Sequence, residues 1–260
     1  MRLKASEKSI SHGRRIDFHT HILPEMDDGS TSLEMSMQMI SSSIRQGVCC
    51  IVLTPHFYAT RDNPKHFLKK RDARVDLLKQ NCPYGVPLLI SGAEVQYFEG
   101  ITAMRELPQM RIEKSNSLMI EMPMCKWTNR MISDISELNS RREYQVILAH
   151  VERYLSYKNL PALRQLANSG VIMQVSSGAF TGFGSYGKMM RLLDEGLVHI
   201  LGSDCHNITS RPPNLADAYD IIEKKRGKAI TKKIVSESIR LLSDQQKESE
   251  PVSANMEFIL

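Results

Sequence analysis

Short apolar runs alternate with longer amphipathic stretches along most of the chain. The apolar runs read IDFH, CCIVLTPH, VPLLISGAEV, SLMIEM, YQVILAH, GVIMQVSSG and LVHILGSDCH. Runs of this length, rich in β-branched residues and bounded by turn residues, are typical of buried strands. Because the stretches between them carry apolar residues at helical spacing, the sequence predicts repeated strand–helix units around a parallel sheet.

The helix predicted at residues 31–46 has the clearest pattern. Its apolar side chains recur at three- and four-residue spacing: Leu33, Met37, Ile40 and Ile44. Thr31 with Glu34 can form a capping box at its start, and Gly47 suits its carboxyl end. Similar patterns predict helices at residues 64–80, 128–141, 160–169, 186–195, 215–225 and 229–243.

Seven strands with their helices predict a single α/β domain at residues 16–243, shaped as a distorted (β/α)7 barrel similar to a TIM barrel. Residues 1–15 are basic and polar and lack the apolar segment of a secretory signal, so we expect a flexible extension there. Residues 244–260 are expected to form a polar tail. In barrels of this kind the active site is built from loops at the carboxyl ends of the strands.

The composition excludes several classes of protein. The apolar fraction of 42% and the charged fraction of 24% are those of a globular domain, not of a disordered or fibrous chain. No apolar run approaches the roughly 20 residues that span a bilayer, so no membrane insertion is expected. The five cysteines form no CxxC pair, and their odd number argues against a disulfide framework and favours a cytoplasmic location.

The net charge of +5 is mild and its lysines and arginines are scattered. The densest basic run, KHFLKKRDAR, is predicted to be the solvated face of a helix. We therefore expect no nucleic acid as a partner, although the run could help attract an anionic one.

Potential metal ligands fall at the ends of nearly all the apolar runs. They comprise five histidines and four carboxylates: His19, His21, Asp28, His56, Glu94, Glu121, His150, Asp204 and His206. His19 and His21 lie one residue apart, so in a strand both side chains point to the same face. Each residue alone has an ordinary structural explanation, such as a hydrogen-bonded histidine or an aspartate in a turn. Together they favour a metal centre, because four buried carboxylates without cations would be strongly unfavourable.

The ligand types restrict the kind of centre. There is no cluster of thiolates, so a closed structural zinc site is not expected. Mixed imidazole and carboxylate ligands suit manganese, iron, zinc or magnesium in an open catalytic site. Nine ligands are too many for one ion, whereas two or three metals sharing a bridging carboxylate would account for them. Closely spaced metals commonly activate water against a phosphate ester.

Four motifs carry a resemblance to a known family. They are IDFHTHILPEMDDGS, GAEV, LAHVERY and SDCHNITSRPPNL, in that order along the chain. With them the sequence resembles the PHP superfamily (polymerase and histidinol phosphatase), and within it the CpsB family of bacterial capsule-biosynthesis tyrosine phosphatases. The resemblance runs from about residue 16 to about residue 222. It implies a PHP-type barrel with three metals, commonly Mn²⁺, that hydrolyses phosphotyrosine on a partner tyrosine kinase controlling capsular or exopolysaccharide synthesis.

The resemblance also implies how the ligands are shared. One metal would be held by four residues: His19, His21, Glu94 and Asp204. Glu94 would bridge to a second metal, which Glu121 and His150 would also hold. The third would be held by the remaining three ligands: Asp28, His56 and His206.

Arg153 in LAHVERY and Arg211 in HNITSR fall where the family places phosphate-binding arginines. An ordinary surface salt bridge is the alternative for each. Asp204 and His206 could also shuttle a proton, although as ligands they are better assigned to the metals. A phenolate leaving group has a pKa of about 10 and needs little help from a general acid, so a tyrosyl phosphate suits such a site.

Three other hypotheses stay open at this point. Cys205 and Arg211 have the spacing of thiol-dependent tyrosine phosphatases, in which a thiolate attacks phosphorus. The intervening residues contain no glycine, so a tight anion-binding loop would be strained. The metals could instead act on a small substrate such as histidinol phosphate. Finally, the chain could be a non-catalytic metal-binding regulator that docks on a kinase or polymerase, and a homo-oligomer is possible in every case.

Overall fold

The strands of the computed structural model follow the predicted apolar runs. The structure describes residues 15–82, 87–182 and 184–243, so the predicted extension, apart from Arg15, and the predicted tail lie outside the described residues. The strands are β1 (Arg15–Thr20), β2 (Val48–Leu53), β3 (His56–Phe57), β4 (Leu88–Ser91), β5 (Glu94–Gln96), β6 (Ser117–Glu121), β7 (Gln145–Leu148), β8 (Ile172–Ser176) and β9 (Ile200–Gly202). All pairings among them are parallel, as predicted.

Two of the predicted strands are each broken in two. CCIVLTPH forms β2 and β3, and VPLLISGAEV forms β4 and β5. Pro55 lies at the first break, where its missing N–H prevents a continuous ladder. The backbone amide of Gly92 donates to Leu53 O at 2.9 Å, and that of Glu94 donates to Pro55 O at 3.0 Å. These bonds hold the two breaks side by side, and they redirect the chain so that His56 and Glu94 begin new strands.

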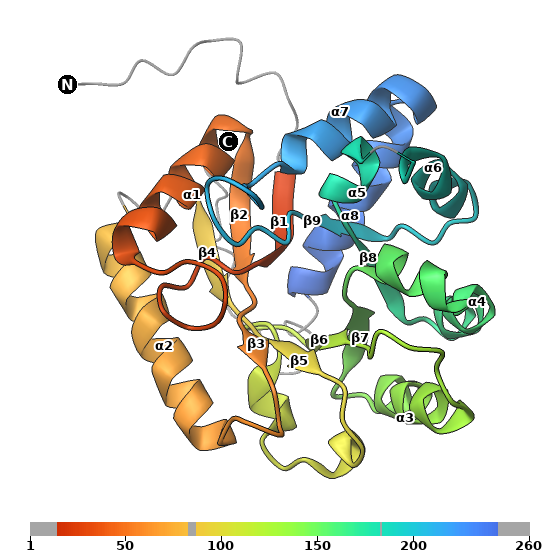
Figure 1. Cartoon of the computed structure of the whole chain (residues 1–260), viewed down its shortest axis with the longest axis horizontal. Coiled ribbons are helices and arrows are strands. Elements are labelled where there is room, and N and C mark those ends of the chain that lie inside the picture. Colours follow the sequence, from red (N-terminus) through yellow and green to blue (C-terminus); the bar gives the residue numbers. More distant parts are fainter. Residues whose placement is uncertain (1–14, 83–86, 183, 244–260) are drawn as a thin grey trace, which may run out of the picture.

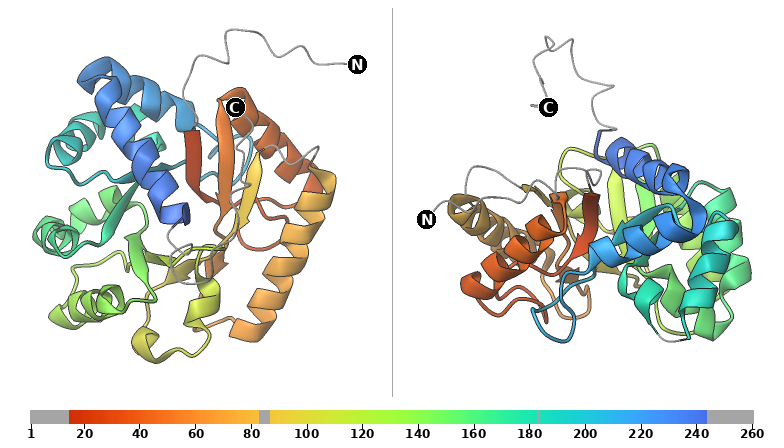
Figure 2. Two further views of the ribbon diagram at one scale, coloured as in Figure 1. Left: turned by 180° about the vertical axis from the view of Figure 1, so that it is seen from behind. Right: turned by 90° about the horizontal axis from the view of Figure 1, so that it is seen from above.

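The strands curl into a distorted barrel. Their orders are β1-β2-β4 in one sheet and β3-β5-β6-β7-β8-β9 in the other. The last strand returns to the first, because Thr20 pairs with Cys205 and the Asp204 amide donates to His19 O at 2.8 Å. The chain therefore forms a single domain with helices around the outside of the curled strands (Figures 1 and 2).

The main helices are those predicted. They are α1 (Leu33–Arg45), α2 (Pro64–Asn81), α3 (Asn129–Ser140), α4 (Leu160–Asn168), α6 (Tyr186–Asp194), α7 (Leu215–Arg226) and α8 (Lys228–Ser243). The short elements η3 (Ile101–Ala103), η4 (Leu107–Met110), η5 (Val151–Tyr157) and α5 (Gly178–Thr181) were not predicted. The predicted Thr31–Glu34 capping box is wrong: the chain is still extended at Ser32, whose side chain caps α1 by accepting from the Met35 amide. Gly47 ends this helix with a φ of 76°, as expected.

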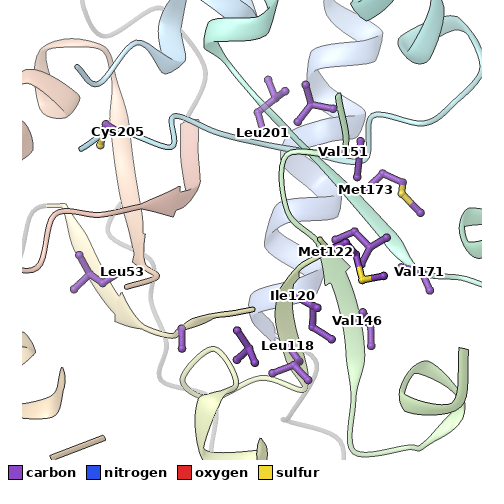
Figure 3. Close-up of a cluster of buried hydrophobic side chains, with 14 of the residues drawn as sticks. Leu53, Leu118, Ile120, Met122, Val146, Val151, Val171, Met173, Leu201 and Cys205 are labelled. Carbon is purple, nitrogen blue, oxygen red and sulfur yellow. The ribbon is translucent and has the colours of Figure 1, made fainter. Parts of the chain in front are cut away.

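The core has two layers. Leu118 and Ile120 of β6 face outwards into a layer shared with the helices, part of which is shown in Figure 3. Met119, between them, faces into a smaller apolar cluster inside the barrel. Leu241 of α8 joins this inner cluster, and its carbonyl accepts from Ser117 at the start of β6. The amino end of the barrel is therefore apolar, which leaves the carboxyl ends of the strands for polar groups.

Candidate metal centre

The nine predicted ligands lie together at one end of the barrel, at or beyond the carboxyl ends of β1, β2, β4, β6, β7 and β9. Three groups have ligand atoms within 4.8 Å of one another: His21, Asp28, His56 and His206; His19, His21 and Asp204; and His56, Glu94 and Glu121. His150 joins them, because its Nε2 lies 2.8 Å from Glu94 Oε1 and 3.4 Å from Glu121 Oε1. No predicted ligand is left outside the cluster.

Glu94, at the first position of β5, lies at the centre of the cluster and is fully buried. Its Oε2 is 2.9 Å from His56 Nδ1 and 3.2 Å from His19 Nε2. Burial alone would raise the pKa of this carboxyl, but the neighbouring imidazoles of His19 and His150 hold it well below its usual range. Glu94 is therefore ionised and has oxygens facing both sides of the centre, as a bridging ligand requires.

Asp204 connects the cluster to the two predicted arginines. Its Oδ1 lies 3.5 Å from His21 Nε2 and 3.8 Å from His19 Nε2. Its Oδ2 accepts a hydrogen bond from Arg153 and forms an ion pair with Arg211, whose guanidinium nitrogen lies 2.7 Å away. Both arginine side chains are more than a third exposed, at 37% and 39%, so they reach from the centre to the surface.

Two ligands have strained backbones. His150 follows β7 with a φ of 34°, and Asp204 follows β9 with a φ of 53°. Residues with side chains rarely adopt this left-handed conformation unless the surrounding fold enforces it, and such strain is concentrated at functional sites. In both cases it turns a side chain into the centre directly after a strand ends.

Asp28 forms the outer edge of the centre. Its Oδ1 lies 3.6 Å from His56 Nε2 and 3.5 Å from His206 Nε2, while 67% of its side chain is exposed. His206 Nδ1 donates to the backbone oxygen of Asp204 at 3.0 Å, which leaves Nε2 facing Asp28. The side of the centre formed by His19, His21 and Glu94 is thus fully buried, whereas the side at Asp28 is open to solvent.

Unpaired polar atoms indicate that these residues suit metal ions. Glu94 Oε2, His56 Nδ1 and His206 Nε2 are buried and lie close to other ligand atoms, yet none of the three makes a hydrogen bond of suitable geometry among the described residues. An unpaired buried polar atom is costly, and a buried carboxylate oxygen especially so. Divalent cations would satisfy all three atoms, and the mixed nitrogen and oxygen donors fit such cations.

The geometry groups some ligands differently from the resemblance. His21 lies with Asp28 and His206 as well as with His19, and His56 lies with Glu94 and Glu121 as well as with Asp28. The two imidazoles are therefore within reach of more than one group. The set of nine residues is unchanged by this overlap.

Asp27 is a functional residue that the sequence analysis missed. Its Oδ2 accepts from His21 Nδ1 at 2.7 Å and from the His56 amide at 3.0 Å, and its Oδ1 accepts from the Gly29 amide at 2.9 Å. The proton on His21 Nδ1 leaves Nε2 free to bind a metal. The DDG motif contained the signal, but only one of its two aspartates was assigned to the site.

Gln174 of β8 was also missed. Its Oε1 lies 3.1 Å from His19 Nδ1 and accepts from the His150 amide at 2.7 Å, so it positions two ligands from the interior of the barrel. The sequence signal was a single amide residue within the apolar strand IMQVS. A polar side chain at a fully buried strand position needs a partner, and here the partners belong to the metal centre.

The thiol mechanism is contradicted at Cys205. This residue is fully buried and belongs to the outer apolar layer of the core. Burial, together with the nearby carboxylate of Asp17, raises the pKa of the thiol well above its usual value. A thiolate nucleophile needs the opposite environment, electropositive and partly exposed.

Comparisons with known proteins agree on one family. A model for capsular polysaccharide synthesis, CpsB/CapC, matches residues 15–242. The tyrosine-protein phosphatase CpsB of Streptococcus pneumoniae is 32% identical over 250 residues, which cover 88% of this chain and 99% of that protein. The tyrosine-protein phosphatase YwqE of Bacillus subtilis is 28% identical over 245 residues, covering 88% and 92%.

The fold comparison gives the same result. A crystal structure from work on YwqE of B. subtilis and CpsB of S. pneumoniae, described as unique metal-dependent tyrosine phosphatases, matches with a TM-score of 0.77. The two chains are 25% identical, and the match covers 92% of this chain and 99% of that one. Among the described residues, no helix is both long enough and apolar enough to cross a membrane.

Proposed function

Because the chain belongs to the CpsB/CapC family of capsular polysaccharide synthesis, we propose that it is a metal-dependent protein-tyrosine phosphatase. The observation that carries the proposal is the cluster of five imidazoles and four carboxylates around Glu94, with two arginines beside it. Two relatives are tyrosine-protein phosphatases, and this chain aligns with 92% and 99% of their respective lengths. The complete ligand set argues against a regulator that has lost its site.

We propose three divalent ions, most simply Mn²⁺, with Fe, Zn or Mg as alternatives. The division of ligands is His19, His21, Glu94 and Asp204 for the first ion. Glu94, Glu121 and His150 would hold the second, and Asp28, His56 and His206 the third. The buried ligand atoms without a hydrogen bond and the lowered pKa of Glu94 at the centre support the binding of cations here, and the number of ligands supports more than one.

The residues of the chain would bind the metals and position the phosphoryl group of the substrate. Divalent ions bound here would activate water as the nucleophile and neutralise charge on the phosphoryl oxygens. Arg153 and Arg211 share one oxygen of Asp204 and have further N–H groups that can grip the phosphoryl group in a fork. The leaving phenolate needs little protonation, so Asp204 and His206 act as ligands first and could move a proton only as a secondary role.

The proposed substrate is the phosphotyrosine-bearing tail of a bacterial tyrosine kinase that controls capsular or exopolysaccharide synthesis, with the reaction in the cytoplasm. The open side of the centre at Asp28 supports a large substrate, since a flexible peptide can approach it from solvent. A small substrate such as histidinol phosphate is the alternative.

One comparison tests the proposal. The manganese-loaded chain should release phosphate from a phosphotyrosine peptide with a kcat/KM at least about tenfold above that for histidinol phosphate, because an alkoxide is a poorer leaving group than a phenolate. A higher value for histidinol phosphate would favour the small-substrate alternative. Peptide binding without hydrolysis would favour the non-catalytic regulator.

A further inference from the structure

A cavity of about 510 Å³ adjoins the open side of the metal centre. It lies between the loop that contains Asp28, strand β3 and the first half of α2, which are neighbours in Figure 1. Its walls include the predicted ligands Asp28 and His56, so the cavity is continuous with the centre. We call it the α2 groove. It is much larger than a phosphate group, and its size is typical of sites that take a ligand as large as a side chain with its backbone.

The groove contains an arginine held in place without an acidic partner. The Arg61 guanidinium lies 4.0 Å from the centroid of the Tyr58 ring, and no ion pair of Arg61 is found among the described residues. The Tyr58 ring in turn stacks on the His56 ring, with centroids 5.0 Å apart. The stack places a solvent-exposed positive charge in the wall of the groove, and a guanidinium on an aromatic face loses less freedom when it binds an anion than a free one does.

Lys70 adds a second positive charge. It is half-buried in the groove, one helical turn after His66 on α2, and makes no ion pair within the described part of the chain. Its neighbours Lys69 and Arg71 do not line the groove. A partly buried ammonium without a carboxylate partner favours an anion from outside.

The three acids of the groove are already engaged. Asp27 accepts from the His21 ring and two backbone amides, and Asp28 faces His56 and His206 at the metal centre. Asp62 accepts from the Tyr58 amide at 2.8 Å and so holds the turn that carries Arg61. Asp27 and Asp28 belong to the centre, so the rest of the groove has two cations, Arg61 and Lys70, against one carboxylate, Asp62.

The groove also has an apolar wall. Met26, Tyr58 and the buried ring of Phe67 contribute to it. Cations beside an apolar wall suit a polypeptide segment with acidic side chains better than they suit a free inorganic anion.

We propose that the α2 groove binds the residues that flank the phosphotyrosine and selects peptides with acidic side chains there. This inference rests on the proposed function and adds a sequence preference to it. The phosphotyrosine itself would be held at the metals and the two arginines. The neighbouring part of the same peptide would lie along β3 and α2, with its carboxylates against Arg61 and Lys70.

Three substrates and two variants test the inference. The substrates are a phosphotyrosine peptide with glutamates on both sides, the same peptide with glutamines instead, and p-nitrophenyl phosphate. The variants are Arg61→Glu/Lys70→Glu and the matched control Lys69→Glu, which changes the charge of the same helix outside the groove. Each is assayed with manganese, and circular dichroism verifies that it is folded.

The unaltered chain should prefer the glutamate peptide over the glutamine peptide by about tenfold in kcat/KM, through KM. The double variant should abolish this preference, whereas Lys69→Glu should retain it. The preference should also shrink as salt is added, since the contacts are partly exposed. Equal turnover of the two peptides by the unaltered chain would overturn the inference, as would loss of the preference in Lys69→Glu. Failure of the proposed function looks different: no substrate, p-nitrophenyl phosphate included, would be hydrolysed.

Discussion

Asp27, Gln174 and the backbone oxygen of Asp204 each contact the ring nitrogen of a ligand histidine that faces away from the centre. A ring nitrogen bonded in this way carries the proton, which leaves the other nitrogen as a donor to a metal. At the scale of single residues, we therefore expect the site to depend also on groups that position its histidines.

Asp27→Asn should weaken metal binding. The amide can present an N–H to His21 Nδ1 instead of an acceptor, which disfavours the ring form that has Nε2 free. We expect the Kd for Mn²⁺ to rise by about 10- to 100-fold, as is usual when such a partner is changed. Isothermal titration calorimetry measures it.

The matched control is Glu25→Gln, an exposed carboxylate of the same loop whose partner is Arg74. Its Kd should stay within about twofold of that of the unaltered chain, because exposed ion pairs contribute little. Equal affinities for Asp27→Asn and Glu25→Gln would show that Asp27 does not position His21.

Metal binding should weaken as the pH falls. Burial alone would lower the pKa of His150, but its hydrogen bonds with Glu121 and Glu94 raise it to about 9. The raised pKa means that the metal-free imidazole is protonated below that pH, so a metal must displace a proton. Metal binding at His206 displaces no proton near neutral pH, since burial and the charges of His21 and Arg211 lower its pKa to about 4. The Kd for Mn²⁺ should therefore rise between about pH 8 and about pH 6. Titrations in buffers of different ionisation enthalpy should detect proton release, and a Kd independent of pH would contradict this account.

The two arginines should matter for turnover rather than for metal content. Arg153→Ala and Arg211→Ala should each lower kcat/KM on a phosphotyrosine peptide by about 100-fold, because each removes donors from the phosphoryl group. Arg164→Ala is the control, since Arg164 pairs with Glu195 on the surface. If the three variants behave alike, Arg153 and Arg211 form only surface salt bridges.

Cys205→Ser should preserve activity, and an inactive Cys205→Ser that keeps its metals would restore the thiol hypothesis.

At the scale of secondary structure, β9 lies so close to β1 that no side chain fits between them at Gly202. A Cβ added there would come within 2.4 Å of His19 Cβ and 2.9 Å of both Gln174 Nε2 and the His19 amide nitrogen. Backbone atoms cannot move aside cheaply, so this contact sets where His19 sits. The closure of the barrel and the position of a metal ligand therefore depend on the same glycine.

Gly202→Ala should lower the free energy of unfolding by about 2 to 3 kcal/mol, as overpacking of a core does, and should also weaken metal binding. Gly187→Ala, in α6, is the contrasting variant, because a Cβ there would meet nothing within 4 Å. It should leave stability unchanged or raise it by up to about 1 kcal/mol, since alanine favours a helix. Urea denaturation measures the free energy of unfolding of both variants. An equal loss of stability in both would contradict the proposed close contact between Gly202 and His19.

Helices and strands differ in how well the sequence predicted them. The main helices were found nearly to the residue, because apolar spacing and end signals such as Gly47 are local properties. The breaks at Pro55 and Gly92 were missed: Pro55 was a local signal within its run, whereas at Gly92 the pairing with Leu53 of the neighbouring strand, which only the folded chain shows, ends the ladder. The cap of α1 was misplaced by one residue for a similar reason: Thr31, Ser32 and Glu34 allow either start.

At the scale of the whole molecule, the barrel gathers the nine predicted ligands from six separate stretches of the sequence at one end. That the nine candidate ligands lie together could be predicted because eight of them end or follow an apolar run, and parallel strands of a barrel end on the same side. Their division among metals could not, because His21 and His56 each lie near two groups. Asp27 and Gln174 were missed because their role depends on ring nitrogens that only the folded chain brings within hydrogen-bond distance.

The central claim is that bound divalent metals make this barrel a phosphotyrosine hydrolase. Metals are removed from the full chain with a chelator, Mn²⁺ is added back in steps, and phosphate release from a phosphotyrosine peptide is followed together with the bound manganese. We predict that activity disappears on chelation and returns as three ions bind per chain, the number proposed for the nine ligands. Full activity after complete removal of the metals, or no phosphate release from a fully loaded chain, would contradict the account.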